Sequence, residues 1–147
     1  DELGGSHVLK IQPKASCNTE LPTFSFDRGA TNAKLVHQAI KNGLVQSAHD
    51  CCEGGLLVAV AEMAFGGNLG ATVYPKASET PELCFTETPS RYILEVSPEH
   101  EENVKHLFAD ATITCIGEFN DSQNLQAGGC QWTTASLKQA WVEGMVI

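Results

Sequence analysis

A run of polar residues followed by two glycines spans residues 47–55, directly before an apolar stretch. If that stretch begins a helix, its free N–H groups and the positive end of its dipole would attract an anion, and a glycine pair would let a phosphate approach the backbone. The candidate cofactor-binding residues are therefore His49, Asp50, Glu53, Gly54 and Gly55. In the alternative interpretation, the glycines only permit a tight turn, which Asp50 and Glu53 cap.

The same run contains His49, Asp50, Cys51 and Cys52, residue types that bind metals or act as nucleophiles. Neighbouring residues of a strand point to opposite faces, and the sequence offers no second ligand cluster or suitably placed base. A histidine that is hydrogen-bonded within the turn is the favoured interpretation. We therefore expect no metal site and no catalytic residue in this chain.

A second polar segment, residues 85–92, precedes an apolar run and supplies the candidate substrate-binding residues Glu87, Ser90 and Arg91. An arginine can grip a phosphate or carboxylate with two parallel hydrogen bonds, and a glutamate can accept from a hydroxyl or amine, or help to hold Mg²⁺ through water. The alternative is an internal ion pair between Glu87 and Arg91 at the edge of a loop.

The cysteines favour free thiols over disulfides, because a 147-residue chain with 42% apolar residues can build a core without covalent staples. No pair has the Cys-x-x-Cys spacing of structural zinc sites, and adjacent cysteines cannot form a relaxed disulfide with each other. We expect a cytoplasmic protein. The cysteines are Cys17, Cys51, Cys52, Cys84, Cys115 and Cys130.

The charge balance argues against polyanionic partners. The chain has 18 acidic and 9 basic side chains and a formal net charge of −9, which would repel nucleic acid and anionic lipid surfaces. No apolar run approaches the ~18 residues of a membrane span, and no secretion signal stands at the start. The chain opens at Asp1 on a polar, glycine-containing stretch, which we interpret as the start of a fragment.

Apolar spacing and turn residues predict one domain of alternating helices and strands. We expect residues 1–30 to be mostly connector with a strand-like run at 8–11, and residues 31–147 to form the core. We expect helices at 31–42, ended by Gly43, and at 56–65, and a brief helical turn at 80–83. A further helix should begin at Pro98 with Ser97 as its N-cap, and a last helix should begin with Ser136 and Gln139 as a capping box. Expected strands cover 45–50, 69–74, 90–96 and 111–119.

The predicted helix at 56–65 is apolar almost all round, so it should be buried between layers. Alternating helices and strands indicate an α/β sandwich with helices packed on a sheet.

Four stretches, in order, resemble the phosphoribosylformylglycinamidine synthase family. Residues 47–56 resemble its His-Asp-x-Ser-(Asp/Glu)-Gly-Gly-Leu segment, and residues 85–92 resemble its Phe-Ser-Glu-Ser-x-Ser-Arg-(Tyr/Phe) segment. Residues 1–6 and 137–141 match the opening and closing of the same domain. The resemblance implies a fold like the carboxy-terminal domain of aminoimidazole ribonucleotide synthetase, a two-layer sandwich of a mixed sheet with helices packed on it.

The resemblance also implies a role. Family members use ATP and ammonia from a glutaminase to convert formylglycinamide ribonucleotide to its amidine. A preceding ATP-binding domain of the same subunit carries the main nucleotide, Mg²⁺ and catalytic positions, so the chain alone should be inactive and bind no cofactor tightly. Cys52 replaces the family's serine, and Thr88-Pro89 replaces Ser-Gln of the first half's substrate motif, which implies a structural nucleotide site in place of the reacting one.

Two alternatives remain open from the sequence. The chain could be the equivalent domain of a selenophosphate synthetase, a thiamine-phosphate kinase or a hydrogenase-maturation relative. It could also be a non-catalytic module that only packs against a neighbouring domain and mediates assembly. Without that domain, two copies could associate as a homodimer.

Overall fold

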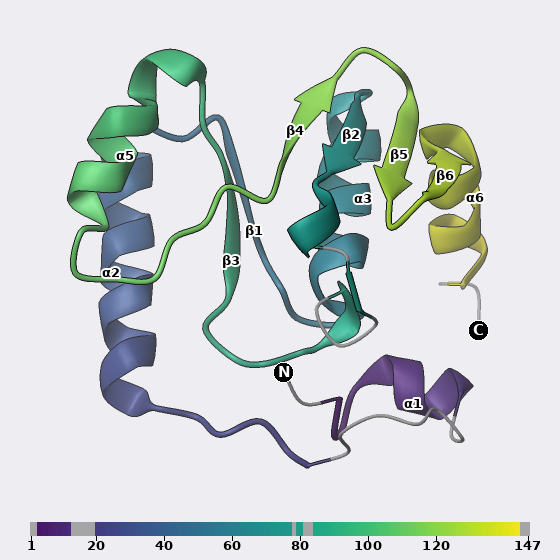
Figure 1. The fold of residues 1–147 in the computed structure, drawn as a ribbon, viewed down its shortest axis with the longest axis horizontal. Helices are drawn as coiled ribbons and strands as arrows, with labels where there is room; N and C mark the ends of the chain where they lie inside the picture. Colours follow the sequence, from purple (N-terminus) through teal and green to yellow (C-terminus); the bar gives the residue numbers. More distant parts are fainter. Residues whose placement is uncertain (1–2, 13–19, 78, 81–83, 145–147) are drawn as a thin grey trace.

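The computed structural model describes residues 3–12, 20–77, 79–80 and 84–144 (Figure 1). Its helices are α1 (His7–Ile11), α2 (Phe26–Lys41), α3 (Gly55–Gly67), α5 (Glu101–Leu107) and α6 (Thr134–Gly144), with 3₁₀ turns η1 (Pro75–Ala77) and η2 (Pro98–His100). Its strands are β1 (Ser47–Asp50), β2 (Gly70–Val73), β3 (Tyr92–Glu95), β4 (Gly117–Asn120), β5 (Asn124–Ala127) and β6 (Cys130–Thr133). None of the helices within these ranges is long and apolar enough to cross a membrane.

The strands form two sheets. β1 and β3 make an antiparallel pair, and the other four strands form a sheet of order β4-β2-β5-β6. In the larger sheet β2 runs parallel to β5, whereas β2–β4 and β5–β6 are antiparallel. The predicted α/β fold with a mixed sheet and packed helices is confirmed.

Helix α3 is the centre of the larger apolar cluster, as its all-round apolar sequence predicted. Seven of its residues are buried, and the cluster extends to β2, β3 and β5, with Leu137 of α6 packed against it. Asn68 ends α3 in the left-handed conformation, with its N–H donating to the Ala64 carbonyl. The helix therefore gives the 50–55 turn before it a rigid base.

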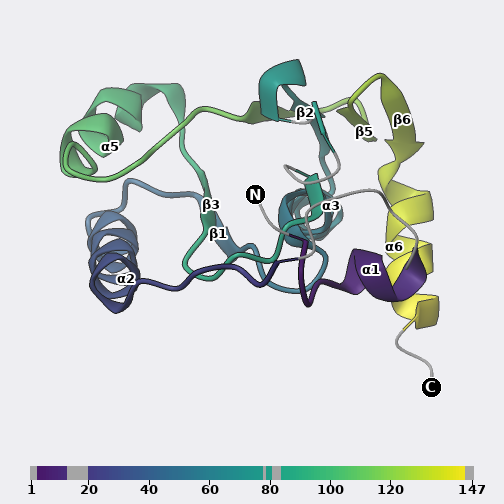
Figure 2. The same cartoon turned by 60° about the horizontal axis from the view of Figure 1, so that its bottom comes forward.

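A smaller apolar cluster joins α2 to α5 through Val36, Ala39, Val104 and Phe108. Adjacent residues of β3 divide between the two clusters, because Ile93 packs with α3 whereas Leu94 packs with α2 and α5. Both views show α2 and α5 on one side of the β1–β3 pair and α3 on the other (Figure 1, Figure 2).

One predicted strand is wrong and another is wrong in part. The run at 8–11 is helix α1, in which the Gln12 N–H donates to the Val8 carbonyl over 2.8 Å in place of a bond to a partner strand. The strand predicted at 111–119 begins only at Gly117, opposite Val73. Beyond Val73 the partner chain turns into η1, so most of residues 111–116 have no strand to pair with.

Of the two caps predicted for the later helices, the first is confirmed in position and the second is wrong. Ser97 is the N-cap residue of η2 and Pro98 follows it, but the Ser97 hydroxyl makes no capping bond and donates to the Glu99 carboxylate. Ser136 lies inside α6, where its N–H donates to Thr133 Oγ1 over 3.1 Å, so Thr133 takes the capping position. Helix α2 begins at Phe26, before the expected Thr31, and the turn expected at 80–83 falls largely outside the described residues.

The sequence interpretation missed the β5–β6 hairpin. Its two-residue loop, Gly128-Gly129, has φ values of +55° and +80°, as a primed hairpin turn requires. The glycine pair was the available signal. All four residues of β6 are exposed, so this strand has no alternation of apolar and polar residues that would mark one buried face.

Candidate functional site

The turn that joins β1 to α3 carries the predicted glycine pair. Gly54 and Gly55 have φ values of +83° and +71°, which side chains rarely allow. A Cβ on Gly55 would lie 2.7 Å from both the Phe85 carbonyl carbon and the Thr86 oxygen. Glycine at position 55 therefore lets the start of α3 pack directly against the backbone of residues 85–86.

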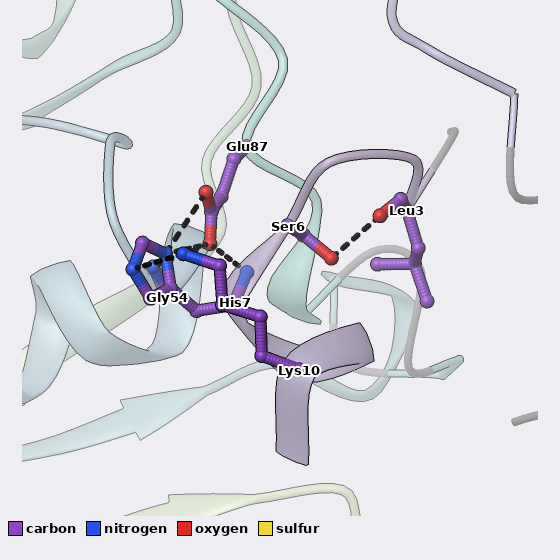
Figure 3. Close-up of polar contacts among 6 residues, drawn as sticks. All are labelled: Leu3, Ser6, His7, Lys10, Gly54 and Glu87. Atoms are coloured by element: carbon purple, nitrogen blue, oxygen red, sulfur yellow. Dashed lines mark hydrogen bonds and ion pairs between the residues drawn. The ribbon is translucent and has the colours of Figure 1, made fainter. Parts of the chain in front are cut away.

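The carboxylate of Glu87 occupies the start of α3. Its Oε1 accepts from the Gly54 N–H over 2.9 Å and from the His7 N–H over 2.8 Å, and it lies 3.1 Å from His7 Nδ1 (Figure 3). A negative group at this position is favoured by the helix dipole and by the unpaired N–H groups of the first turn. The anion that the turn attracts is thus an internal one.

These contacts shift the acidity of Glu87. Partial burial raises the pKa of its carboxyl, but the N–H donors of His7 and Gly54 and the His7 side chain act in the opposite direction. The net result is a pKa below the ordinary value for glutamate. Glu87 is therefore an anion at neutral pH.

Arg91 and Ser90 hold the loop that carries Glu87. Arg91 Nη1 donates to the Thr86 carbonyl over 3.1 Å, and the Arg91 carbonyl accepts from the Cys51 N–H over 2.9 Å. Ser90 has a φ of +67°, and its carbonyl accepts from Asn32 Nδ2 over 3.0 Å. Among the described contacts Arg91 makes no ion pair with Glu87, so the alternative of an internal pair between them is not what the structure contains.

His49 lies apart from the Glu87 cluster, on β1. Its Nδ1 is 2.7 Å from the Asp50 carbonyl, in line with the interpretation of a histidine bonded within the turn, and its Nε2 is 3.4 Å from Glu62 Oε2 of α3. Asp50 and Glu53 are exposed, and in the described part of the chain neither side chain bonds to the start of α3. Glu87 takes the capping role that the sequence offered to those two acids.

The structure thus brings Gly54, Gly55 and Glu87 together and leaves His49, Asp50 and Glu53 outside that cluster. Sequence reasoning missed His7 and Glu62. His7 is 80 residues from Glu87 in the chain, and no local pattern connects them. Glu62 interrupts the apolar run of α3 on the side that faces His49, which was a usable signal.

Two of the thiols are buried in surroundings that disfavour the thiolate. Burial raises the pKa of Cys51, and it raises that of Cys84. The five cysteines within the described residues are free, and Cys17 lies outside them. In that same part of the chain no three His, Cys, Asp or Glu side chains gather closely enough to hold a metal ion.

Comparisons with known proteins connect the fold to one family. Residues 10–129 match the model of the family described as AIR synthase related protein, C-terminal domain. The chain is 40% identical over 107 residues to the phosphoribosylformylglycinamidine synthase subunit PurL of Moorella thermoacetica. That match covers 72% of this chain but 14% of the relative, so the chain spans a small part of the curated protein it matches.

Solved structures give the same fold. A Thermotoga maritima PurL complexed with FGAR superimposes with a TM-score of 0.71 and 16% identity, over 86% of this chain and 23% of that one. The structure of PurLQS from Thermotoga maritima gives 0.70 and 17%, over 81% and 23%. A Thermotoga maritima PurL complexed with ATP gives 0.64 and 20%, over 73% and 21%.

Proposed function

The chain belongs to the family described as AIR synthase related protein, C-terminal domain, and from that premise we propose that it is the carboxy-terminal domain of a phosphoribosylformylglycinamidine synthase. The larger enzyme is an ATP-dependent ligase of purine biosynthesis in the cytoplasm, which converts formylglycinamide ribonucleotide to formylglycinamidine ribonucleotide with glutamine-derived ammonia. The observation that carries the proposal is the 40% identity to PurL over 107 residues. This identity favours the synthase over the selenophosphate, thiamine-phosphate and hydrogenase-maturation alternatives.

ATP and Mg²⁺ belong, in this proposal, to the complete enzyme. Related chains were solved with ATP, ADP and FGAR. In this chain the Gly54 N–H already donates to Glu87 and the Gly55 N–H to the Cys52 carbonyl, so neither glycine amide is open to a phosphate. We infer that the preceding domain holds most of the nucleotide and the metal, and that the chain alone binds neither tightly and is inactive.

Within the complete enzyme, we propose the same roles for the candidate cofactor-binding and substrate-binding residues as the sequence predicted. In this proposal a nucleotide phosphate displaces the Glu87 carboxylate from the turn, which is bordered by His49, Asp50, Glu53, Gly54 and Gly55. Glu87, Ser90 and Arg91 then form the loop next to the substrate. What supports this arrangement is the direct packing of the 85–86 backbone on Gly55, which puts loop and turn side by side.

A second candidate function, a module that buttresses a neighbouring domain, is favoured by exposed apolar side chains near the amino terminus. Ile11, Leu21 and Phe26 are 78%, 76% and 83% exposed, so a neighbouring domain that packed on them would remove apolar surface from water. We propose that the preceding domain of the same subunit covers them, and that the glutaminase acts on the complete enzyme. A homodimer of the isolated chain would bury the same side chains.

A chimera tests the two functions. The segment of Moorella thermoacetica PurL that matches this chain is replaced by the chain, and ADP release is measured with FGAR and ammonia. We expect release that requires both substrates, whereas the 147-residue chain alone gives none. A folded, soluble chimera with no FGAR-dependent ADP release would contradict the synthase function and leave the buttressing role.

A further inference from the structure

Residues 3–12 form an N-terminal strap that is held together mainly by its own bonds. The Ser6 N–H and hydroxyl both donate to the Leu3 carbonyl, over 3.0 and 2.6 Å, and Gly5 between them has a φ of +77°. Helix α1 follows at once and closes with the Gln12 N–H on the Val8 carbonyl. The strap is therefore a structured unit in its own right (Figure 3).

The strap meets the rest of the chain at Glu87. The backbone N–H of His7 donates to Oε1 over 2.8 Å, and His7 Nδ1 lies 3.1 Å from the same oxygen. The same oxygen also accepts from the Gly54 N–H of the α3 turn, so one carboxylate joins three segments that are distant in sequence (Figure 3). Hydrogen bonds to a charged group are stronger than neutral ones.

The other anchors that the described residues show lie at the start of the strap. Leu3 and Ser6 are 1% and 2% exposed, and the Gly4 N–H donates to the Glu20 carbonyl over 3.1 Å. Neither apolar cluster of the described chain includes a strap residue, and Lys10, Ile11 and Gln12 are exposed. Detachment of residues 7–12 would therefore leave both apolar clusters intact, whereas detachment of residues 3–6 would also expose Leu3 and Ser6.

We propose that Glu87 is a latch that fastens the strap to the first turn of α3, so that strap and turn are released together, as one local event, when the carboxylate is neutralised. Release also frees the Gly54 N–H, the donor that points to an anion at the start of α3. A phosphate that binds this turn must then take the place of Glu87. The latch is inferred from contacts within this chain, and its test does not depend on the proposed function.

Amide hydrogen exchange on the 147-residue chain at neutral pH tests the latch. Glu87→Gln removes the charge while keeping the shape of the side chain, and Glu79→Gln makes the same change at an exposed glutamate as the matched control. We expect exchange in the strap and at Gly54 to become about tenfold faster or more in Glu87→Gln. Exchange in β2 and β5, and all exchange in Glu79→Gln, should match the unmodified chain.

A second variant, His7→Pro, covers the case in which Glu87→Gln does not fold. Proline suits the first position of α1, because it fixes a helical φ and because Ser6 already has the extended ψ of 159° that a residue before proline needs. The change removes both donors of His7 and should speed exchange in residues 8–12. A strap that stays protected in this variant would refute the latch.

Two outcomes of the Glu87→Gln measurement overturn the proposal. Faster exchange in the strap without faster exchange at Gly54 would show that the two segments are not coupled through the carboxylate. A uniform increase across β2, β5 and the strap would show a loss of global stability, with no local release.

Discussion

Replacement of Gly55 by alanine should destabilise the chain through a direct clash. The backbone at this position has a φ of +71°, and an added Cβ would lie 2.7 Å from two backbone atoms, the Phe85 carbonyl carbon and the Thr86 oxygen. Real Cβ atoms essentially never approach so closely, and backbone atoms cannot turn aside as a flexible side chain can. The loop that carries Glu87 would have to move.

Gly43→Ala separates the two costs of that change. Gly43 has a φ of +69°, close to that of Gly55, but nothing lies within 4 Å of its added Cβ. The left-handed backbone should cost either variant about 1–2 kcal/mol. Overpacking adds about 1–3 kcal/mol only in Gly55→Ala, which brings its total to about 2–5 kcal/mol.

Urea unfolding followed by circular dichroism measures both variants. With a urea dependence of about 2 kcal/mol per M, the extra cost in Gly55→Ala lowers its midpoint by about 1 M relative to Gly43→Ala. The slope should be unchanged, since the unfolded chain is the same. Equal midpoints for the two variants would refute the view that Gly55 is required for contact with the 85–86 backbone.

Three further outcomes follow from burial and charge. Leu125→Ala, at a site 2% exposed in the larger cluster, should lower the free energy of unfolding by about 2–5 kcal/mol in the same urea assay; a loss under about 1 kcal/mol would contradict its place in the core. Although partial burial raises the pKa of Glu87, its N–H donors lower it overall, so its stabilisation is complete above the ordinary carboxyl pKa and is lost as the pH falls through the lowered value. When the free energy of unfolding is measured at decreasing pH, Glu87→Gln should lack this part of the decline. Identical pH dependence in the variant and the unmodified chain would contradict a stabilising role of the charged Glu87. Burial raises the pKa of Cys51 and of Cys84, so iodoacetamide should alkylate both more slowly than exposed Cys130, as peptide mass spectrometry would show; equal rates would disprove their protection.

Elements with a strong local pattern could be predicted from the sequence. The apolar run of α3 has no polar face to expose, so its burial follows from composition. The end of α2 before Gly43 and the end of β1 at Asp50 were also predicted correctly, because the glycine and the polar turn that follow them are local features. The family resemblance added the fold, which no single pattern defined.

Elements that depend on distant partners could not be predicted. The run at 8–11 contains residues that favour strands, yet it is helical, and the N–H that begins its helix bonds to a side chain 80 residues away. The strand expected from residue 111 fails for the opposite reason, since β2 ends at Val73 and leaves most of residues 111–116 without a partner strand. In both cases the number of available partners, and not the propensity of the segment, decided the structure.

The start of α3 has a negatively charged group beside it, but that group is a side chain of the protein. From the glycine pair we expected a phosphate at the helix N-terminus, and in the structure the Gly54 N–H donates to the Glu87 carboxylate. The two interpretations of the turn, an anion site and a capped turn, therefore rest on the same attraction between the free N–H groups of the helix start and a negative charge. If a nucleotide phosphate binds here in the complete enzyme, it must displace Glu87 from Gly54. That exchange would release His7 and the strap, so ligand binding at the turn and the position of the amino-terminal segment would be linked.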